Sequence, residues 1–145
     1  MLIFLLIAQA LALPLPLRYT PGLKLDGVDH YHDKSAQIKV AVSPSKLKFS
    51  DLNAEGVADV QKLFAVKAEY GEMFGFKKWH AKRHKLQEDS RGRALLIEGD
   101  YESLEGRKVH FLEIYWANNS SAREFLFTSD SKPIQLEQYT TVFAP

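Results

Sequence analysis

The sequence predicts an α+β fold: an antiparallel β-meander, preceded by one long helix and followed by a short C-terminal helix packed on one sheet face. Two patterns support this prediction. Residues 54–72 repeat apolar side chains every three or four positions, as an amphipathic helix does. After Gly75, short segments rich in aromatic and branched residues alternate with turn signals, which is typical of antiparallel strands. We therefore expect helices to cover one face of a sheet.

Composition places the chain among ordinary globular domains. Its 145 residues are 46% hydrophobic and 26% charged, which suits one domain with an apolar core. The net charge of +1 gives no overall field that would direct the chain to nucleic acid or to a bilayer. Cysteine is absent, which excludes disulfides, thiolate catalysis, cysteine-ligated zinc and iron–sulfur clusters. No cofactor is expected.

Residues 1–12 are predicted to be a signal peptide. Residues 2–8 are uninterrupted and apolar, and two A-x-A patterns end at Ala10 and Ala12. This stretch is well short of the ~20 residues that a membrane-spanning helix needs. No Lys or Arg precedes it, so only the amino terminus supplies positive charge. We expect a secreted or periplasmic protein without a transmembrane segment after signal removal. The alternative is a short buried element of the mature fold.

The mature chain is predicted to hold an extended lead-in at residues 13–35 and a single α+β domain at residues 36–145. Prolines and glycines punctuate the lead-in. Residues 36–42 then alternate apolar and polar side chains, which predicts a strand. In the following helix Val57, Val60 and Phe64 share a face. Capping residues are available at positions 50, 51 and 53, and glycines at 71 and 75 offer stops.

Four segments after the helix are predicted to form the meander. They lie at residues 74–89, 93–101, 107–117 and 122–129, separated by polar turns. The third carries bulky side chains on both faces and is expected to be a central strand. Near the end, Pro133 follows Ser131, and Leu136, Tyr139 and Phe143 have helical spacing, which predicts the final helix.

Two histidines in the first of these segments raise the question of a metal site. On a helix, His80 and His84 would share a face and could share an ion. On a strand they would share a face at about 13 Å, because each residue advances ~3.3 Å. Helix-forming residues lie between them, but Gly75 before and the turn at 89–92 after favour a strand. No metal is therefore expected here.

The same segment concentrates positive charge. Between residues 77 and 93 the local excess is +5, whereas the rest of the chain carries −4. Such a surface could bind an anionic envelope component or an acidic protein face; export makes nucleic acid an unexpected partner. Alternatively, the lysines only discourage edge-to-edge strand pairing. The candidate binding residues are Lys77, Lys78, Trp79, Lys82, Arg83, Lys85, Arg91 and Arg93.

Further candidate sites are less specific. His30 and His32 would face one side of an extended chain and could bind a divalent cation loosely, or be merely solvated. Glu98 and Asp100 share a strand face near Glu113 on the next strand, which could form a paired-carboxylate site. No serine-nucleophile, zinc-protease or phosphate-loop motif is present. The main hypothesis is therefore a non-catalytic binding or assembly domain, and the alternative is a small hydrolase using scattered Asp, Glu and His residues.

The C-terminal half resembles the PsbP-like superfamily. The resemblance rests on "GRKVHFLEIYWA", an aromatic strand after a glycine turn, followed by "AREFLFTSD" and a terminal helix that ends at Phe143. It covers residues 36–145 by the order of elements and includes no diagnostic motif. The extra strand usual before the last helix is missing. The resemblance implies a non-catalytic binding or assembly role. A cystatin-like helix and meander is a comparable structural alternative.

Overall fold

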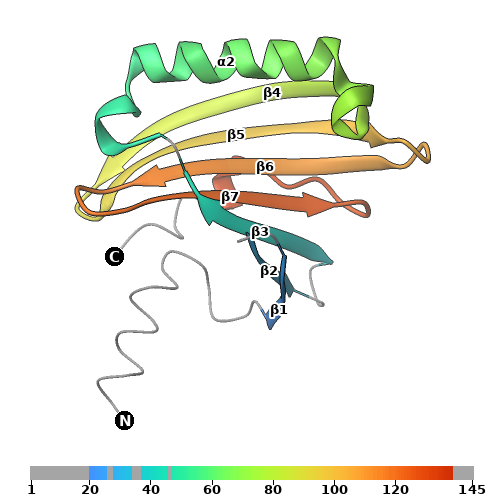
Figure 1. Ribbon diagram of the computed structural model, residues 1–145, viewed down its shortest axis with the longest axis horizontal. Coiled ribbons are helices and arrows are strands. Elements are labelled where there is room, and N and C mark those ends of the chain that lie inside the picture. Colours follow the sequence, from blue (N-terminus) through green and yellow to red (C-terminus); the bar gives the residue numbers. More distant parts are fainter. Residues whose placement is uncertain (1–19, 26–27, 34–36, 46, 139–145) are drawn as a thin grey trace.

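A seven-stranded antiparallel sheet with one long helix forms the molecule (Figure 1). This computed structural model describes residues 20–25, 28–33, 37–45 and 47–138. The α+β prediction is confirmed. The predicted signal peptide and the positions of Tyr139 and Phe143 lie outside the described residues. Within the described ranges, no helix has the length and apolar character needed to cross a membrane.

The sheet order is β1-β2-β3-β7-β6-β5-β4, with β4 at one edge. The predicted meander is confirmed in β4 to β7, and the chain between β3 and β4 passes through the long helix. The strands are β1 (Thr20–Leu25), β2 (Val28–Asp33), β3 (Ile38–Pro44), β4 (Phe76–Asp89), β5 (Gly92–Ser103), β6 (Lys108–Ala117) and β7 (Ala122–Ser129).

The predicted lead-in includes a β-hairpin. Where residues 13–35 are described, β1 and β2 pair with each other, and β2 pairs with β3, with Tyr31 opposite Val40. Pro21 suggested a non-strand segment, but an edge strand tolerates proline because one side of its backbone needs no ladder hydrogen bond. The pairing of β1 with β2 shifts register between Pro21 and Lys24. The hairpin therefore extends the sheet beyond β3.

The helix α2 (Ala54–Glu69) confirms the prediction for residues 54–72, apart from its last turn. The Asn53 side chain accepts hydrogen bonds from the backbone N–H groups of Glu55 and Gly56, at 3.0 and 3.1 Å. This N-cap satisfies two amides that have no partner within the helix. Short 3₁₀ turns flank α2 at η1 (Phe49–Asp51) and η2 (Gly71–Phe74), and η2 ends at Gly75 with φ 88°.

Both sheet faces bury apolar side chains, as expected for central strands. On β6, Phe111 and Tyr115 face α2, whereas Leu112 and Ile114 face the opposite side. The opposite core also contains Ile134 and Leu136 from the chain after β7.

The expectation that both helices cover one face is therefore wrong for the described part of the C-terminal segment. Phe125 and Phe127 of β7 point away from α2, and the segment after β7 packs in the same core as these rings. Of the predicted final helix, the structure describes a 3₁₀ turn, η3 (Leu136–Gln138).

Helix α2 lies over β4, at one edge of the sheet, so the helix side of the sheet is covered unevenly (Figure 1). Beneath α2, Leu95, Ile97 and Phe111 are fully buried. Farther across the same face, Ala41 of β3 and Leu126 of β7 are only half-buried. No described helix lies over β3 and β7. We call the helix side of β3, β7 and the adjoining part of β6 the open half of the sheet.

Candidate functional site

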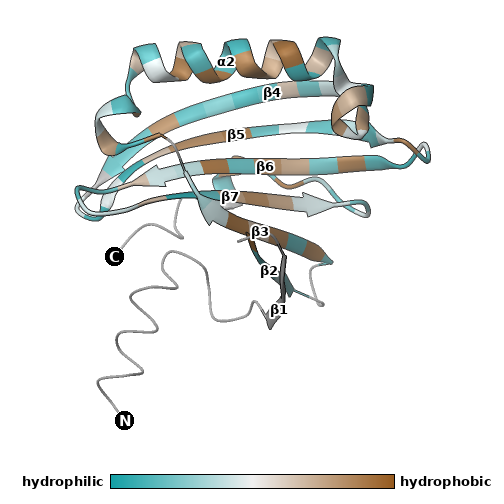
Figure 2. Ribbon diagram, viewed as in Figure 1, coloured by the Kyte–Doolittle hydropathy of each residue, from teal (hydrophilic) through white to brown (hydrophobic). Residues whose placement is uncertain are grey.

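The strand β4 confirms that the basic segment is extended and not helical, and its exposed edge is mostly hydrophilic (Figure 2). His80 lies opposite Asp100, and His84 lies opposite Ile97. A β-bulge between Ala81 and Arg83 inserts one residue between these pairs. The bulge reverses the alternation, so the two histidines follow opposite faces; the expectation that they share a face is wrong.

A groove of about 410 Å³ between α2 and β4 is bordered by the stretch of β4 from Trp79 to His84. The His84 Nδ1 atom is 3.5 Å from the Gln61 Nε2 atom of α2. Within the described ranges, no three His, Cys, Asp or Glu residues are grouped as a metal site would require. This includes His30 and His32, which follow one face of β2 opposite Ala41 and Lys39.

The positive charge of β4 is largely compensated by its neighbours. Carboxylates of β5 lie opposite the cations, and Arg83 also donates to Glu137 at 2.8 Å. The charge-assisted hydrogen bonds with Arg83 hold the pKa values of Glu98 and Glu137 below their usual range. Sequence counting missed Glu98 and Glu137 because they lie on other elements. The ion pairs are Lys78–Glu102 (3.1 Å), Lys82–Asp100 (2.6 Å), Arg83–Glu98 (2.6 Å) and Arg93–Glu88 (3.3 Å).

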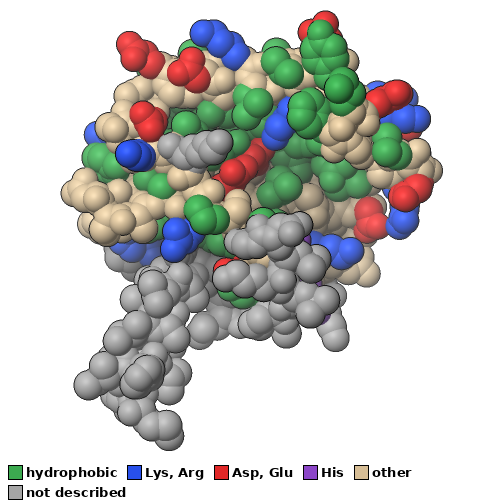
Figure 3. Space-filling model, viewed as in Figure 1, with side chains coloured by type: hydrophobic (Ala, Val, Ile, Leu, Met, Phe, Trp, Pro, Cys, Tyr) green, Lys and Arg blue, Asp and Glu red, His purple; other side chains and the backbone are tan. Residues whose placement is uncertain are grey.

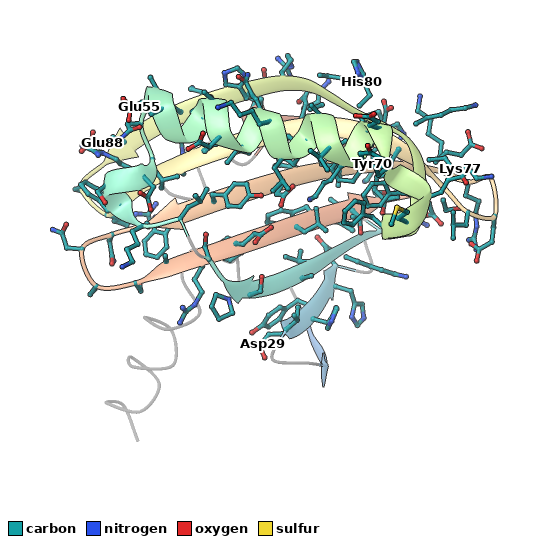
Figure 4. All side chains as sticks on the ribbon, turned by 45° about the horizontal axis from the view of Figure 1, so that its top comes forward. Asp29, Glu55, Tyr70, Lys77, His80 and Glu88 are labelled. Atoms are coloured by element: carbon teal, nitrogen blue, oxygen red, sulfur yellow. The ribbon has the colours of Figure 1, made fainter. Side chains whose placement is uncertain are left out.

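Trp79 does not belong to the basic surface with which the sequence grouped it. Its side chain is 7% exposed and stacks on Phe111, with ring centroids 4.2 Å apart. Arg93 lies 4.0 Å from the centroid of the Phe49 ring, and Arg91 is half-buried. Lys77 and Lys85 form no ion pair within 4 Å among the described side chains. Lys77 and Glu88 mark the two ends of the strand (Figure 4).

The predicted site of three carboxylates is divided between the two sheet faces. Glu98 and Asp100 share a face, as the sequence indicated. Glu113 lies opposite Ile97, so its side chain points to the other side of the sheet. The prediction that Glu113 adjoins Glu98 and Asp100 is therefore wrong. Strand register decides this point, because neighbouring residues of paired strands share a face only when they are directly opposite or two apart.

A different acidic cluster forms on the open half of the sheet. Glu113 of β6 is 2% exposed, and its Oε1 atom accepts a hydrogen bond of 2.8 Å from the Tyr115 hydroxyl. Glu124 of β7 lies opposite Tyr115 and is half-buried. We call Glu113, Tyr115 and Glu124 the carboxyl cluster. The paired strands β6 and β7 hold all three side chains on the helix side.

One carboxyl group of the carboxyl cluster, Glu124, retains its proton at neutral pH. Burial, followed by the hydrogen bond with Glu113 and its charge, raises the pKa of Glu124 to about 8. The Glu113 Oε2 atom is buried and finds no hydrogen-bond donor among the described residues when both carboxyl groups are ionised. A proton on Glu124 supplies that donor. Burial also raises the pKa of Tyr115, so its hydroxyl remains a donor at physiological pH.

One cation of α2 acts on this cluster. The Lys67 Nζ atom lies 5.1 Å from the Trp79 ring centroid and 5.2 Å from that of Phe64. Its charge opposes the rise in the pKa of Glu124. Figure 3 shows this side of the molecule, where acidic side chains lie at the centre of a largely hydrophobic surface with a basic side chain nearby. Two carboxyl groups, an apolar surround and partial access together make a candidate ligand site.

Compared with known protein families and with curated proteins, the chain matches neither a family model nor a curated sequence. The resemblance to the PsbP-like superfamily remains a prediction. The candidate site therefore rests on the geometry of this chain alone.

The sequence contained part of the signal for the carboxyl cluster. Glu113 interrupts an apolar face of a predicted central strand, between Phe111 and Tyr115. The polar turn after Ala117 would also have set the register that brings Glu124 opposite Tyr115. Neither pattern reveals which half of the face α2 leaves open, because that depends on tertiary packing.

Proposed function

We propose that the chain is an exported, non-catalytic binding domain that holds its ligand on the open half of the sheet. Export is supported by the apolar segment at residues 2–8 and the small residues that follow it. Binding is supported by the carboxyl cluster, in which two buried or half-buried carboxyl groups lie beside a half-exposed apolar surface. Carboxyl groups whose pKa is raised by burial and by a neighbouring carboxyl group concentrate at functional sites.

The surface beside Glu113 has the character of a ligand site. Leu126, Thr128 and Ala41 line it from two paired strands and are all half-buried. Ligand sites combine such apolar walls with a few polar groups that orient the ligand. The carboxyl cluster supplies those polar groups at this site.

A neutral fluorescent probe tests this location. N-phenyl-1-naphthylamine, which fluoresces strongly in apolar sites, should bind the mature protein saturably. The substitution Leu126→Arg should weaken this binding at least tenfold, because it places a charge on the open half. Ala41→Arg, from the opposite strand, should act in the same way if Leu126→Arg fails to fold. Leu104→Arg is the matched control, since Leu104 is 53% exposed and lies on the β5–β6 hairpin. Equal binding by all three variants would reject the location.

The basic edge of β4 is a second candidate surface within the same proposal, for an anionic envelope component or an acidic protein. Lys77 and Lys85 supply charge that no described carboxylate pairs within 4 Å. Replacing Lys82, Arg83 and Lys85 by Glu should release the protein from vesicles containing phosphatidylglycerol at low salt. Retained binding of the triple variant would eliminate this surface.

A small hydrolase is the alternative function, and the carboxyl cluster is the observation that favours it. A carboxyl group with a raised pKa beside a second carboxyl group can serve as a general acid. Turnover of p-nitrophenyl esters, phosphates or glycosides that disappears in Glu124→Gln would support this alternative. Absence of turnover across the three substrate classes would count against it.

A further inference from the structure

Resting on the proposed function, we infer that the ligand of the open half is an organic cation with an apolar body, and that its binding releases a proton from the carboxyl cluster. The relevant chemistry is that of a protonated amine or a quaternary ammonium group. The cation would take the place of the proton that lies between Glu113 and Glu124.

Charge balance favours a single positive charge. With both carboxyl groups ionised, Glu113, Glu124 and Lys67 together carry one net negative charge. One monovalent cation neutralises it, whereas an anion would add to a buried negative charge at high cost. The proton now shared by the two carboxyl groups performs the same neutralisation. Cation and proton therefore compete for the same oxygens.

Among the described residues, the groups that face Glu124 come from three elements. Tyr115 and Glu113 approach from β6, and Lys67 approaches from α2. On β3, the residue opposite Glu124 is Ser43, which carries no charge. Lys67 occupies a position over the Trp79 and Phe64 rings and does not form an ion pair within 4 Å among the described side chains. In the described part of the chain, Lys67 balances one of the two negative charges, and the proton balances the other.

The flank of α2 beside this site carries exposed apolar side chains on both sides of Lys67. Leu63 precedes Lys67 by four residues and Tyr70 follows it by three, so the three side chains share a helix flank. Leu63 is 45% exposed and Tyr70 is 49% exposed. The opposite flank, with Ala65 and Ala68, borders the groove against β4. The exposed apolar flank and Leu126 can therefore cover the body of a ligand whose charged head reaches Glu113.

A metal ion fits this site less well than an organic cation. Calcium and magnesium bind six or more oxygen ligands, and the cluster supplies two carboxyl groups and one hydroxyl. Aromatic rings at Phe111, Trp79 and Tyr115 line the adjacent core, and such rings attract ammonium groups over their faces. The chemistry points to an ammonium head in an apolar surround.

Isothermal titration calorimetry with octylammonium and with 1-octanol tests the inference. The two probes share the alkyl chain and differ in charge. At pH 7 we expect octylammonium to bind at least tenfold more tightly than octanol. Repeating the titration in phosphate and in Tris, whose ionisation enthalpies differ, should show close to one proton released per bound cation.

Two substitutions and one control complete the design. Glu113→Gln should weaken octylammonium binding at least tenfold. Glu124→Gln should weaken it and abolish proton release, because an amide has no proton to lose at this pH. Glu69→Gln, an exposed carboxylate of α2, should change neither quantity.

The possible results distinguish failure of the cation hypothesis from failure of the proposed ligand surface. Equal affinity for octanol and octylammonium, or binding of the cation without proton release, overturns the inference and leaves a neutral ligand for the same surface. Binding of neither octyl probe overturns the inference, and the neutral naphthylamine probe then decides the proposed function separately.

Discussion

Lys78 adopts a left-handed backbone conformation, with φ 51°, at a bulge of β4. This conformation costs an L-amino acid roughly 1–2 kcal/mol, and glycine avoids the cost. The ion pair with Glu102 involves a Lys78 side chain that is 80% exposed, so it contributes little to stability. The bulge is therefore held by the surrounding strand pairing at the expense of one strained residue.

Substituting Lys78 tests this strain. We expect Lys78→Gly to change the free energy of unfolding by less than about 1 kcal/mol, because relief of strain offsets the greater freedom of the unfolded chain. Lys77→Gly, at the preceding residue, whose φ is not positive, should lower it by about 1 kcal/mol. Urea unfolding of both variants measures the difference. An equal loss in the two variants would contradict the strain at Lys78.

Glu124 predicts how stability depends on pH. Its pKa is raised in the folded protein, so its contribution is full below its unfolded pKa and is lost as pH rises through about 8. Urea unfolding should therefore show stability that declines between pH 5.5 and about 8, with no further decline from this group between pH 8 and 9. Glu124→Gln should remove on the order of 1–2 kcal/mol of that decline, a value reduced for partial exposure.

Glu98 provides a control of opposite sign. Its pKa is lowered by Arg83, so its contribution is present above its unfolded pKa and is lost as pH falls through the folded value. Glu98→Gln should alter stability in acid and leave the slope between pH 7 and 9 unchanged. A pH profile of Glu124→Gln that matches the parent protein above pH 7 would contradict the raised pKa of Glu124.

At the scale of secondary-structure elements, α2 depends on its N-cap. Asn53→Ala removes the acceptor for two backbone N–H groups and should lower the free energy of unfolding by about 1 kcal/mol. Asn53→Asp retains an acceptor and should preserve stability. Thermal unfolding followed by circular dichroism measures both variants. A loss of similar size in Asn53→Asp would show that the cap hydrogen bonds are not the cause.

The contact between β4 and β5 depends on Gly99. A Cβ atom placed there would lie within 2.6 Å of the Phe111 ring and still closer to the His80 carbonyl oxygen. Gly99→Ala should therefore lower the free energy of unfolding by about 1–3 kcal/mol through overpacking. Near-ultraviolet circular dichroism should also change, because Trp79 stacks on Phe111. Unchanged stability and spectrum would contradict the close packing.

Periodicity predicted the elements well and the relations between them poorly. The helix over Ala54–Glu69 and the four strands of the meander follow from local patterns of apolar residues. The two bulges of β4 could not be predicted in this way. A bulge is defined by the pairing with a neighbouring strand, so it cannot be recognised in the sequence of one strand alone. The pairing of Arg83 with Glu98 and Glu137 depends in turn on that register and on the C-terminal segment.

At the scale of the whole molecule, the placement of α2 over one edge creates the candidate site. Beneath the helix, the aromatic side chains around Trp79 are packed in a buried core. On the same face of the sheet, the parts of β7 and β3 that α2 does not cover are only half-buried. Sequence analysis identified the amphipathic helix but could not place it laterally on the sheet. The main candidate site is therefore the carboxyl cluster of β6 and β7, whereas the sequence had indicated the exposed edge of β4.

A crystal structure of the mature protein with octylammonium tests the central claim most directly. We predict density for the ammonium nitrogen within hydrogen-bond distance of Glu113 Oε2 and of the Glu124 carboxyl group, with the alkyl chain along Leu126 and the flank of α2. Occupation of the groove between α2 and β4 instead, with the carboxyl cluster free of ligand, would contradict the claim.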